Sequence, residues 1–425
     1  MGMTIVEKIL ARAGGVPNVS PGDFVVVNVD TAVLFDNNFS TLYWRDVLKV
    51  ADPEKNVVAF DHRVPPPDKA SAQAQVVGRD FVNRFGIKRF HDIGRNLGIS
   101  HVVVADNGYA LPGTVLVCSD THTGSGGAFN CAARGVGGPD IIYAAIKAET
   151  WFRVYPTIRY DIEGKLGPSV TAKDVFLYLA NTYGDHAGHN IEFGGPGMGG
   201  LRIDARRTIA AMCTELNAEF AIFEADDVVI EHVRKRNPAP FTPTDPDADA
   251  GYAARRTLDL SQVEILVAKP DTLLNNAVPV REVAGTAIDQ GFIGSCANGN
   301  LDDLEIAARV LTGRCVAPGV RLLVTPGSQE VYRQALKAGY IEIFMEAGAV
   351  VTNPTCGACS GGHMGLLGAN ETCITASTRN NKGRMGDPSA RIYMGSPATV
   401  AASAVTGVIT DPGEFLHGSL AKVAS

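Results

Sequence analysis

The segment Val320–Val351, VRLLVTPGSQEVYRQALKAGYIEIFMEAGAVV, predicts the fold class of this chain. It begins with an apolar run, Val320–Val324, which is closed by the turn residues Thr325–Gly327. A helical pattern follows over 328–338, and a second β-branched run comes at 349–351. A strand, a helix and a second strand in this order are typical of a parallel sheet that is covered by helices.

The same alternation of short β-branched runs and longer Ala-rich stretches continues over most of the chain. It predicts an α/β fold with buried, parallel strands. A chain of 425 residues is too long for one ordinary core, and we predict three α/β domains at 1–155, 156–258 and 259–425. Further strands are predicted at 23–29, 57–60, 101–104, 115–117 and 263–267, and further helices at 69–85, 129–149, 172–183, 205–217 and 302–312.

Composition and charge exclude several classes of protein. Hydrophobic residues make up 45% of the chain and charged residues 20%, which rules out extensive disorder. The net charge of −7 leaves no basic surface for a phosphate backbone, so no nucleic-acid partner is expected. No apolar run reaches the ~20 residues that a membrane helix needs, and the first residues do not resemble a signal peptide. We therefore expect a cytoplasmic protein with no membrane partner.

Three of the eight cysteines lie in Gly-rich, loop-like segments: Cys296, Cys356 and Cys359. A Cys-x-x-Cys pair can present two thiolates to one metal centre, and a third thiolate can come from a distant loop. A redox dithiol would leave Cys296 unexplained, structural zinc needs four ligands, and a [4Fe–4S] cluster on three thiolates leaves one iron open. Spacing alone leaves these interpretations and a purely structural role open. The remaining cysteines are predicted to be packing residues: Cys118, Cys131, Cys213, Cys315 and Cys373.

Further motifs stand in a fixed order around these cysteines. Together the chain's motifs resemble those of the aconitase superfamily, and the resemblance covers nearly the whole chain. The matching segments are Asp61-His62, His101 and Asp120–Thr123 for the catalytic histidines, Gly294–Gly299, Thr325–Ser328 and Cys356–Cys359 for the cluster, and Ser377–Arg384 for the arginine motif. The chain departs from the usual pattern of the family at Phe35, Thr121, Ala297, Thr378 and Asn381.

The resemblance implies a fold, a cofactor and a partner. It implies three α/β domains around a cleft that contains a [4Fe–4S] cluster with one open iron, held by Cys296, Cys356 and Cys359. In length the chain is most like the large subunits of isopropylmalate dehydratase and of related two-subunit hydratases for citramalate, homoaconitate or dimethylmalate. This implies a hydro-lyase that acts on a small hydroxylated di- or tricarboxylic acid together with a small swivelling-domain subunit.

The resemblance also implies roles for individual residues. Dehydration needs an acid for the leaving hydroxyl and a base for the carbon-bound proton, and an imidazole paired with a carboxylate suits the acid role. The implied catalytic residues are Asp61, His62, His101, Asp120, His122 and Glu215, with Glu215 near His101. Because guanidinium groups bind carboxylates bidentately, Arg379 and Arg384 are implied to bind substrate, as are Thr121 and Ser125. The other histidines are predicted to be structural or surface residues: His91, His186, His189, His232, His363 and His417.

Two other functional classes stay open. A non-catalytic iron–sulfur or zinc-binding protein could use the same cysteines, and a redox dithiol protein could use the Cys-x-x-Cys pair. The histidine and arginine motifs favour the enzyme, because neither alternative needs them.

Overall fold

The structure is a computed structural model that describes residues 2–416. Contacts between residues divide the chain into two compact units. Unit 1 is Met1–Lys165 with Asp185–Asp259, and unit 2 is Leu166–Gly184 with Leu260–Ser425. This grouping by contacts does not test the predicted three-domain division, which stays a prediction. None of the helices formed by the described residues is long and apolar enough to cross a bilayer.

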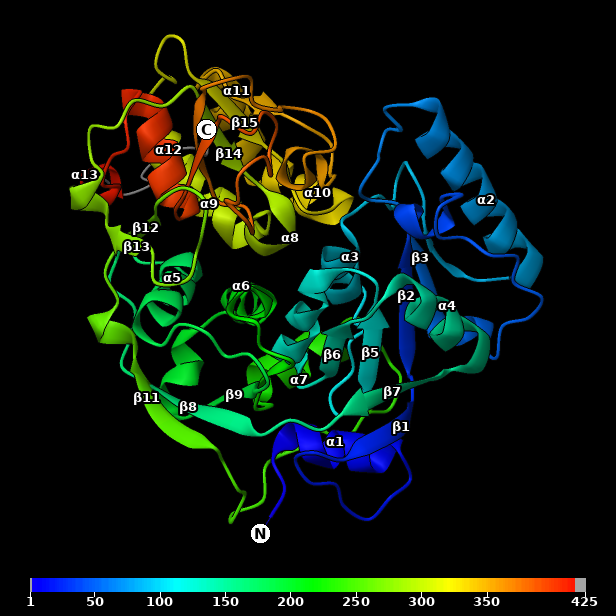
Figure 1. Ribbon diagram of the computed structural model, residues 1–425. Helices are drawn as coiled ribbons and strands as arrows, with labels where there is room; N and C mark the ends of the chain where they lie inside the picture. The colour runs from blue at the N-terminus through cyan, green and yellow to red at the C-terminus, as the bar shows by residue number, and fades with distance from the viewer. Residues whose placement is uncertain (1, 417–425) are drawn as a thin grey trace. The chain divides into compact units, whose positions relative to one another are not determined.

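Unit 1 contains a five-stranded sheet in which every neighbouring pair of strands is parallel. Its strands lie in the order β4 (Arg89–His91), β3 (Asn56–Ala59), β2 (Thr31–Phe35), β5 (Val115–Cys118) and β6 (Ala132–Gly135), and Figure 1 shows β2, β3 and β5 side by side. The helices of this part of the chain are α1 (Ile5–Ala13), α2 (Lys69–Phe85), α3 (Ser100–Asp106) and α4 (Gly138–Lys147). The predicted α/β fold class is confirmed.

Two further β-structures belong to unit 1. The strands β1 (Phe24–Asn28) and β7 (Glu149–Arg153) form an antiparallel ribbon. A four-stranded parallel sheet has the order β10 (Ala221–Phe223), β9 (Asn190–Gly194), β8 (Thr157–Glu163) and β11 (Ala254–Asp259). The helices α6 (Ile203–Met212) and α7 (Asp227–Arg234) accompany this second sheet in the sequence.

Unit 2 is built on a seven-stranded mixed sheet. Its strand order is β13 (Ala277–Pro279), β12 (Leu266–Ala268), β18 (Arg391–Met394), β17 (Thr372–Thr375), β14 (Gln290–Ile293), β15 (Arg321–Val324) and β16 (Val350–Val351). The five strands from β18 to β16 are parallel to one another. The helices of unit 2 are α5 (Ala172–Thr182), α8 (Ser295–Asn298), α9 (Leu301–Leu311), α10 (Gln329–Lys337), α11 (Tyr340–Glu346), α12 (Pro397–Thr406) and α13 (Gly413–Leu416).

The predicted helix at 69–85 is α2, and its ends show why the sequence indicates it so clearly. The Asp68 carboxylate accepts a hydrogen bond from the Ser71 backbone N–H and caps the first turn. Gly86 ends the helix with a left-handed φ of 66°, a conformation that costs glycine little. Local capping thus fixes both ends of this helix without help from distant residues.

The prediction of a strand at 101–104 is wrong, because these residues form helix α3. Three consecutive valines favour a strand by propensity. In the structure, however, Val102, Val103 and Val104 are each no more than 2% exposed. A segment that is surrounded on all sides shows neither helical nor strand periodicity. Its conformation is therefore decided by tertiary contacts, among them a hydrogen bond from the Ser100 N–H to the Asp61 carboxylate at 2.7 Å.

The structure places most of the predicted structural histidines in ordinary packing contacts. His186 Nε2 lies 2.7 Å from the Tyr160 hydroxyl, and His91 Nε2 lies 3.3 Å from that of Tyr109. The His232 ring packs beside Phe129, with ring centroids 5.2 Å apart. Burial, followed by the charge of Arg236, lowers the pKa of His232 to about 4. His417 lies outside the described residues.

This lowered pKa predicts an acid sensitivity of the fold. Between about pH 6.5 and 4 the unfolded chain protonates His232 and the folded chain does not, so the free energy of unfolding should fall as the pH is lowered through this range, by about 3 kcal/mol in all. His232→Gln removes the titrating group, so denaturant unfolding from pH 7 to 4 should show a shallower pH dependence in the variant. His189→Gln, at a histidine whose contact with the Ala187 carbonyl is exposed, is the control, and equal pH profiles for wild type and His232→Gln would contradict this assignment.

Candidate active site

The carboxyl ends of the parallel strands in unit 1 bring the predicted catalytic segments together. Asp36 follows β2, Asp61-His62 follow β3, and Asp120–His122 follow β5. The strands β3 and β4 are added on one side of β2, and β5 and β6 on the other, so the strand order reverses between β2 and β5. Open parallel sheets bind their ligands at such points.

Asp61 and His62 form a directly bonded pair. The His62 Nδ1 and Asp61 Oδ1 atoms are 2.6 Å apart, and Asp61 is fully buried. The second oxygen of Asp61 accepts the Ser100 N–H at the start of α3. The face of the imidazole packs on Phe35, with ring centroids 4.5 Å apart. The carboxylate therefore holds the His62 ring in position and accepts from its Nδ1–H.

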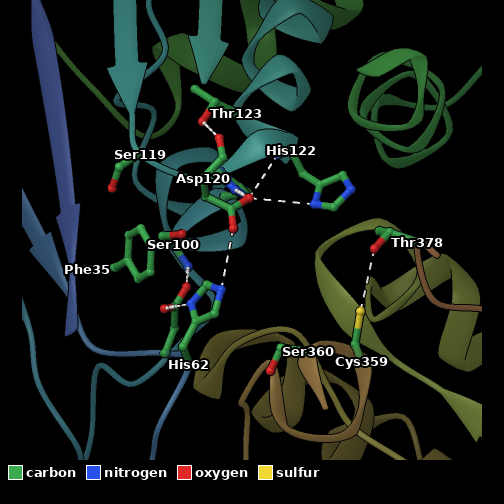
Figure 2. A network of polar contacts seen from close by, with 12 residues as sticks. Phe35, His62, Ser100, Ser119, Asp120, His122, Thr123, Cys359, Ser360 and Thr378 are labelled. Carbon is green, nitrogen blue, oxygen red and sulfur yellow. Dashed lines mark hydrogen bonds and ion pairs between the residues drawn. The ribbon is translucent and has the colours of Figure 1, made fainter. Parts of the chain in front are cut away.

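Asp120 connects three histidines, as Figure 2 shows in part. Its Oδ1 lies 2.7 Å from His101 Nε2 and accepts the backbone N–H of His122 at 2.8 Å, and its Oδ2 lies 3.4 Å from His62 Nε2. Burial by itself would raise the pKa of this carboxyl, but the charge of His101 and hydrogen bonds from the histidines hold the pKa well below its usual range. Asp120 thus stays an anion that can stabilise a protonated imidazole.

Glu215 pairs with His122 in the structure. It lies in the 3-10 helix η5 (Cys213–Leu216), and its Oε1 is 2.9 Å from His122 Nε2. His101 contacts Asp120, and the predicted nearness of Glu215 to His101 stays a prediction. The turn of η3 (Thr121–Phe129) carries the His122 ring toward η5 after β5 ends. The site therefore contains a second imidazole–carboxylate pair, His122–Glu215.

Asp36 is a residue of this site that the sequence analysis missed. Its side chain is buried and accepts the backbone N–H groups of Asp61, His62 and Arg63 at 3.3, 3.0 and 2.7 Å. Burial, and then the neighbouring charge of Asp61, raise its pKa, against the opposing effect of His62. Asp36 thus shapes the loop that carries His62. Its position directly after an apolar run, Thr31–Phe35, is the signal that could have identified it.

The predicted substrate-binding residues Thr121 and Ser125 both lie in η3. The carbonyl of Thr121 accepts a hydrogen bond from Thr214 Oγ1 at 3.2 Å, and Ser125 is 3% exposed. Between them, a Cβ added at Gly124 would lie 3.1 Å from the Ala210 carbonyl of α6. Close backbone packing against α6 therefore fixes the loop. The roles of Thr121 and Ser125 toward a substrate stay predictions.

In unit 2 the other predicted segments also follow the carboxyl ends of parallel strands. Cys296 lies in α8 directly after β14, and Cys356 and Cys359 lie in the loop after β16. Arg379 and Arg384 follow β17, which is the other parallel neighbour of β14. One contact joins two of these loops, since Cys359 Sγ lies 3.5 Å from Thr378 Oγ1 (Figure 2).

The surroundings of the three cysteines fit a bound metal cluster. Cys296, Cys356 and Cys359 are buried, but each residue retains a little exposure, of 6%, 8% and 5%. Four buried polar atoms at the same sheet edge have no hydrogen-bond partner among the described residues: Asn298 Oδ1, Asn300 Oδ1, Ser377 Oγ and Arg384 Nε. Buried polar atoms rarely lack a partner, so these atoms fit a polar ligand bound at this sheet edge.

The remaining cysteines separate clearly from these three. Cys118, Cys131, Cys213 and Cys373 have no exposed surface, and burial raises the pKa of each thiol. Their predicted packing role agrees with this burial. The same prediction is wrong for Cys315, which is exposed. It lies in the loop between α9 and β15, where a single small apolar residue can face solvent at little cost.

Comparison with known proteins agrees with this geometry. The model of the aconitase family (aconitate hydratase) matches residues 45–407. The chain belongs to the aconitase family. Membership of the aconitase family implies an iron–sulfur cluster, and the residues around Cys296, Cys356 and Cys359 fit one.

Several relatives of this aconitase-family chain align over almost their full length. It is 52% identical over 411 residues to the 3-isopropylmalate dehydratase large subunit of Mycolicibacterium smegmatis, which covers 97% of both chains. It is 42% identical to a probable 3-isopropylmalate dehydratase large subunit of Methanothermobacter thermautotrophicus, over 98% of this chain and all of that one. The holo-form crystal structure of aconitase X from Thermococcus kodakaraensis has a TM-score of 0.47 and 12% identity, covering 93% of this chain and 90% of that chain.

The Asp61–His62 pair can be tested by removing the carboxylate charge. Both oxygens of Asp61 accept N–H donors, so Asp61→Asn must turn its NH₂ group toward one of them. A loss of about 1.5–3 kcal/mol should lower kcat/KM of the hydratase reaction about 10–100-fold. The control is Asp92→Asn, which breaks a surface pair with Arg79 and should leave kcat/KM unchanged. Wild-type kinetics in Asp61→Asn would show that this carboxylate does not position His62.

Proposed function

We propose that the chain is the large, catalytic subunit of a hydro-lyase that removes water from, or adds it to, a hydroxylated di- or tricarboxylic acid. The leading substrate is 3-isopropylmalate, because the relatives with 52% and 42% identity carry that name. Citramalate, homoaconitate and dimethylmalate are the alternative substrates. The observation that carries the proposal is the Asp120 network, since three imidazoles around one half-buried carboxylate suit proton transfer and are not needed by a regulator.

We further propose that Cys296, Cys356 and Cys359 hold a [4Fe–4S] cluster with one open iron. Three cysteines whose spacing offers no standard fourth ligand favour this over structural zinc, and the involvement of Cys296 argues against a redox dithiol. When bound, the open iron would serve as a Lewis acid toward the substrate hydroxyl and the adjacent carboxylate. A compartment that keeps thiols reduced, such as the cytoplasm, suits these residues.

Within this proposal the imidazole–carboxylate pairs handle protons. His101 would protonate the leaving hydroxyl, and the anionic Asp120 at 2.7 Å would stabilise its cationic form before that step. The pairs His62–Asp61 and His122–Glu215 are available for the second proton, and their carboxylates orient each ring. Thr121 and Ser125 would contact the substrate from η3.

The arginine motif would hold the substrate carboxylates. Arg379 is half-buried after β17, and Arg384 has a buried Nε without a hydrogen-bond partner. A carboxylate would give this donor the partner that it lacks, and a planar guanidinium could bind it through two parallel hydrogen bonds. Ser377 Oγ, also buried without a partner, lies in the same motif.

A separate small subunit with a swivelling domain is the proposed partner. The relatives are named large subunits and align with this chain over almost its whole length, which supports a second chain in the active enzyme. Part of the carboxylate-binding surface, and with it part of the substrate specificity, would then come from the small subunit.

The function is tested by reconstitution. The chain loaded anaerobically with iron and sulfide should bind about four irons and show broad visible absorption. With the small subunit it should dehydrate 3-isopropylmalate, whereas alone it should show little turnover. Cys356→Ser should abolish both absorption and activity, and Cys315→Ser, at an exposed thiol, should affect neither. Stoichiometric zinc without iron uptake, or a cluster without turnover on any hydroxy acid, would favour the non-catalytic alternative.

The role of Arg384 is tested by a substitution that keeps its charge. Lysine cannot form the bidentate contact, so Arg384→Lys should lose about 1.5–3 kcal/mol of transition-state binding, which lowers kcat/KM about 10–100-fold. Cluster absorption should not change, which separates this defect from loss of iron. Lys382→Arg, on an exposed residue of the same loop, is the matched control. Unchanged kinetics in Arg384→Lys would show that Arg384 does not bind a substrate carboxylate.

A further inference from the structure

The β1–β7 ribbon of unit 1 has one buried face and one solvent-exposed face. Val25, Val27 and Phe152 on the inner face are no more than 7% exposed. On the outer face, Phe24 is 70% exposed and Trp151 is 56% exposed, with their ring centroids 5.9 Å apart. Val26 on the same face is 61% exposed. An aromatic surface of this kind, which stays open to solvent within the described chain, is typical of an interface.

The outer edge of β7 also carries free backbone groups. Hydrogen bonds from Val154 N to Asp23 O and from Val29 N to Ala148 O fix the alternation of the ladder. By this alternation, the backbone N–H and C=O groups of Glu149, Trp151 and Arg153 point away from β1. Among residues 2–416 no hydrogen bond reaches these groups, and β7 has no strand partner other than β1. Such an edge pairs readily with another strand.

Two charges on this strand have no ionic partner among the described residues. Glu149 and Arg153 lie two residues before and two residues after Trp151, and all three side chains share the outer face of the ribbon. No ion pair joins either charge to another part of the described chain. One face of the strand therefore presents an acid, a tryptophan and a base in this order. A second copy of the strand that runs in the opposite direction would place its base opposite the acid and its acid opposite the base.

We propose that β7 pairs antiparallel with β7 of a second copy of this chain, about a two-fold axis at Trp151. Glu149 then lies opposite Arg153 of the second copy, and Arg153 lies opposite Glu149 of the second copy. The two indole rings lie side by side on the axis, and Phe24 and Val26 of each copy flank them. The result is a four-stranded sheet in the order β1, β7, β7, β1, in which the outward backbone groups of both edges are paired.

The charges select this register and this occupant. A shift of the register by one residue would require the backbone groups of Thr150 and Phe152 to pair with the second copy. Those groups already face β1, so this register is excluded. A shift by two residues would put a charge opposite a tryptophan and leave the charges unpaired. Pairing with a different protein, such as the small subunit, does not require an acid and a base at equal distances on either side of one residue. A second copy needs that arrangement, because two-fold symmetry makes each contact occur twice.

Sedimentation velocity of the full chain over a wide concentration series tests the proposal. One pair of strands with its flanking side chains is a small interface, so we expect reversible dimerisation from 44.8 kDa to twice that mass. Glu149→Arg and Arg153→Glu each set like charges opposite each other at two positions and should weaken the dimer about tenfold or more. The double variant Glu149→Arg with Arg153→Glu restores opposite pairs and should dimerise like the wild type.

Controls separate this interface from general effects of a surface substitution. Trp151→Lys should give a monomer, whereas Leu336→Lys, at a leucine with 57% exposure on α10, should not change the mass. Because the chain has only two tryptophans, Trp44→Phe leaves Trp151 as the sole reporter, and its emission should shift to shorter wavelength as the dimer forms. A chain that stays monomeric at every concentration would overturn the proposal. A double variant that does not recover would overturn the register, and a Trp151→Lys that loses only small-subunit binding would identify that subunit as the occupant instead.

Discussion

Parallel strand pairing puts the carboxyl ends of neighbouring strands at one edge of a sheet, and both groups of functional residues begin there. In unit 1 the loops after β2, β3 and β5 supply Asp36, Asp61-His62 and Asp120–His122. In unit 2 the loops after β14, β16 and β17 supply the cysteines and the arginine motif. Residues that are far apart in sequence therefore meet because their strands are parallel members of one sheet, and each loop needs to extend only a short way beyond its strand.

The unit 1 network also shows how buried charges can be tolerated. Asp120 and Asp36 lie at the same sheet edge, and burial acts to raise the pKa of both. Histidines around Asp120 more than offset this effect and keep it anionic, whereas Asp36 has the Asp61 carboxylate beside it and a raised pKa. Backbone N–H groups of three residues donate to Asp36, which compensates for its burial by hydrogen bonding rather than by charge. One carboxyl is thus suited to proton chemistry and the other to holding a loop.

Local sequence signals predicted those features of the fold that local interactions determine. The helix at 69–85 agrees with α2 because a cap residue and a left-handed glycine mark its ends. The segment 101–104 was predicted as a strand because its valines favour one, and the Asp61 carboxylate that receives its first N–H comes from a distant loop. The pairing of Glu215 with His122 could not be read from the sequence for the same reason, since the direction of the His122 ring depends on how η3 packs against α6. Asp36 was missed because nothing in its local sequence shows that three backbone N–H groups will surround it.

Position relative to a strand end also distinguishes the two classes of cysteine, which their spacing could not. Cys373 lies within β17 and Cys118 closes β5, so each side chain packs in the sheet core, where burial disfavours the thiolate. Cys296, Cys356 and Cys359 lie past the ends of their strands, where the backbone turns and small exposed surfaces remain. A thiol must lose its proton to bind a metal, and that is least costly where polar groups or solvent can reach it. The strand ends that gather the acids and histidines in unit 1 thus provide, in unit 2, the surroundings in which thiolates can form.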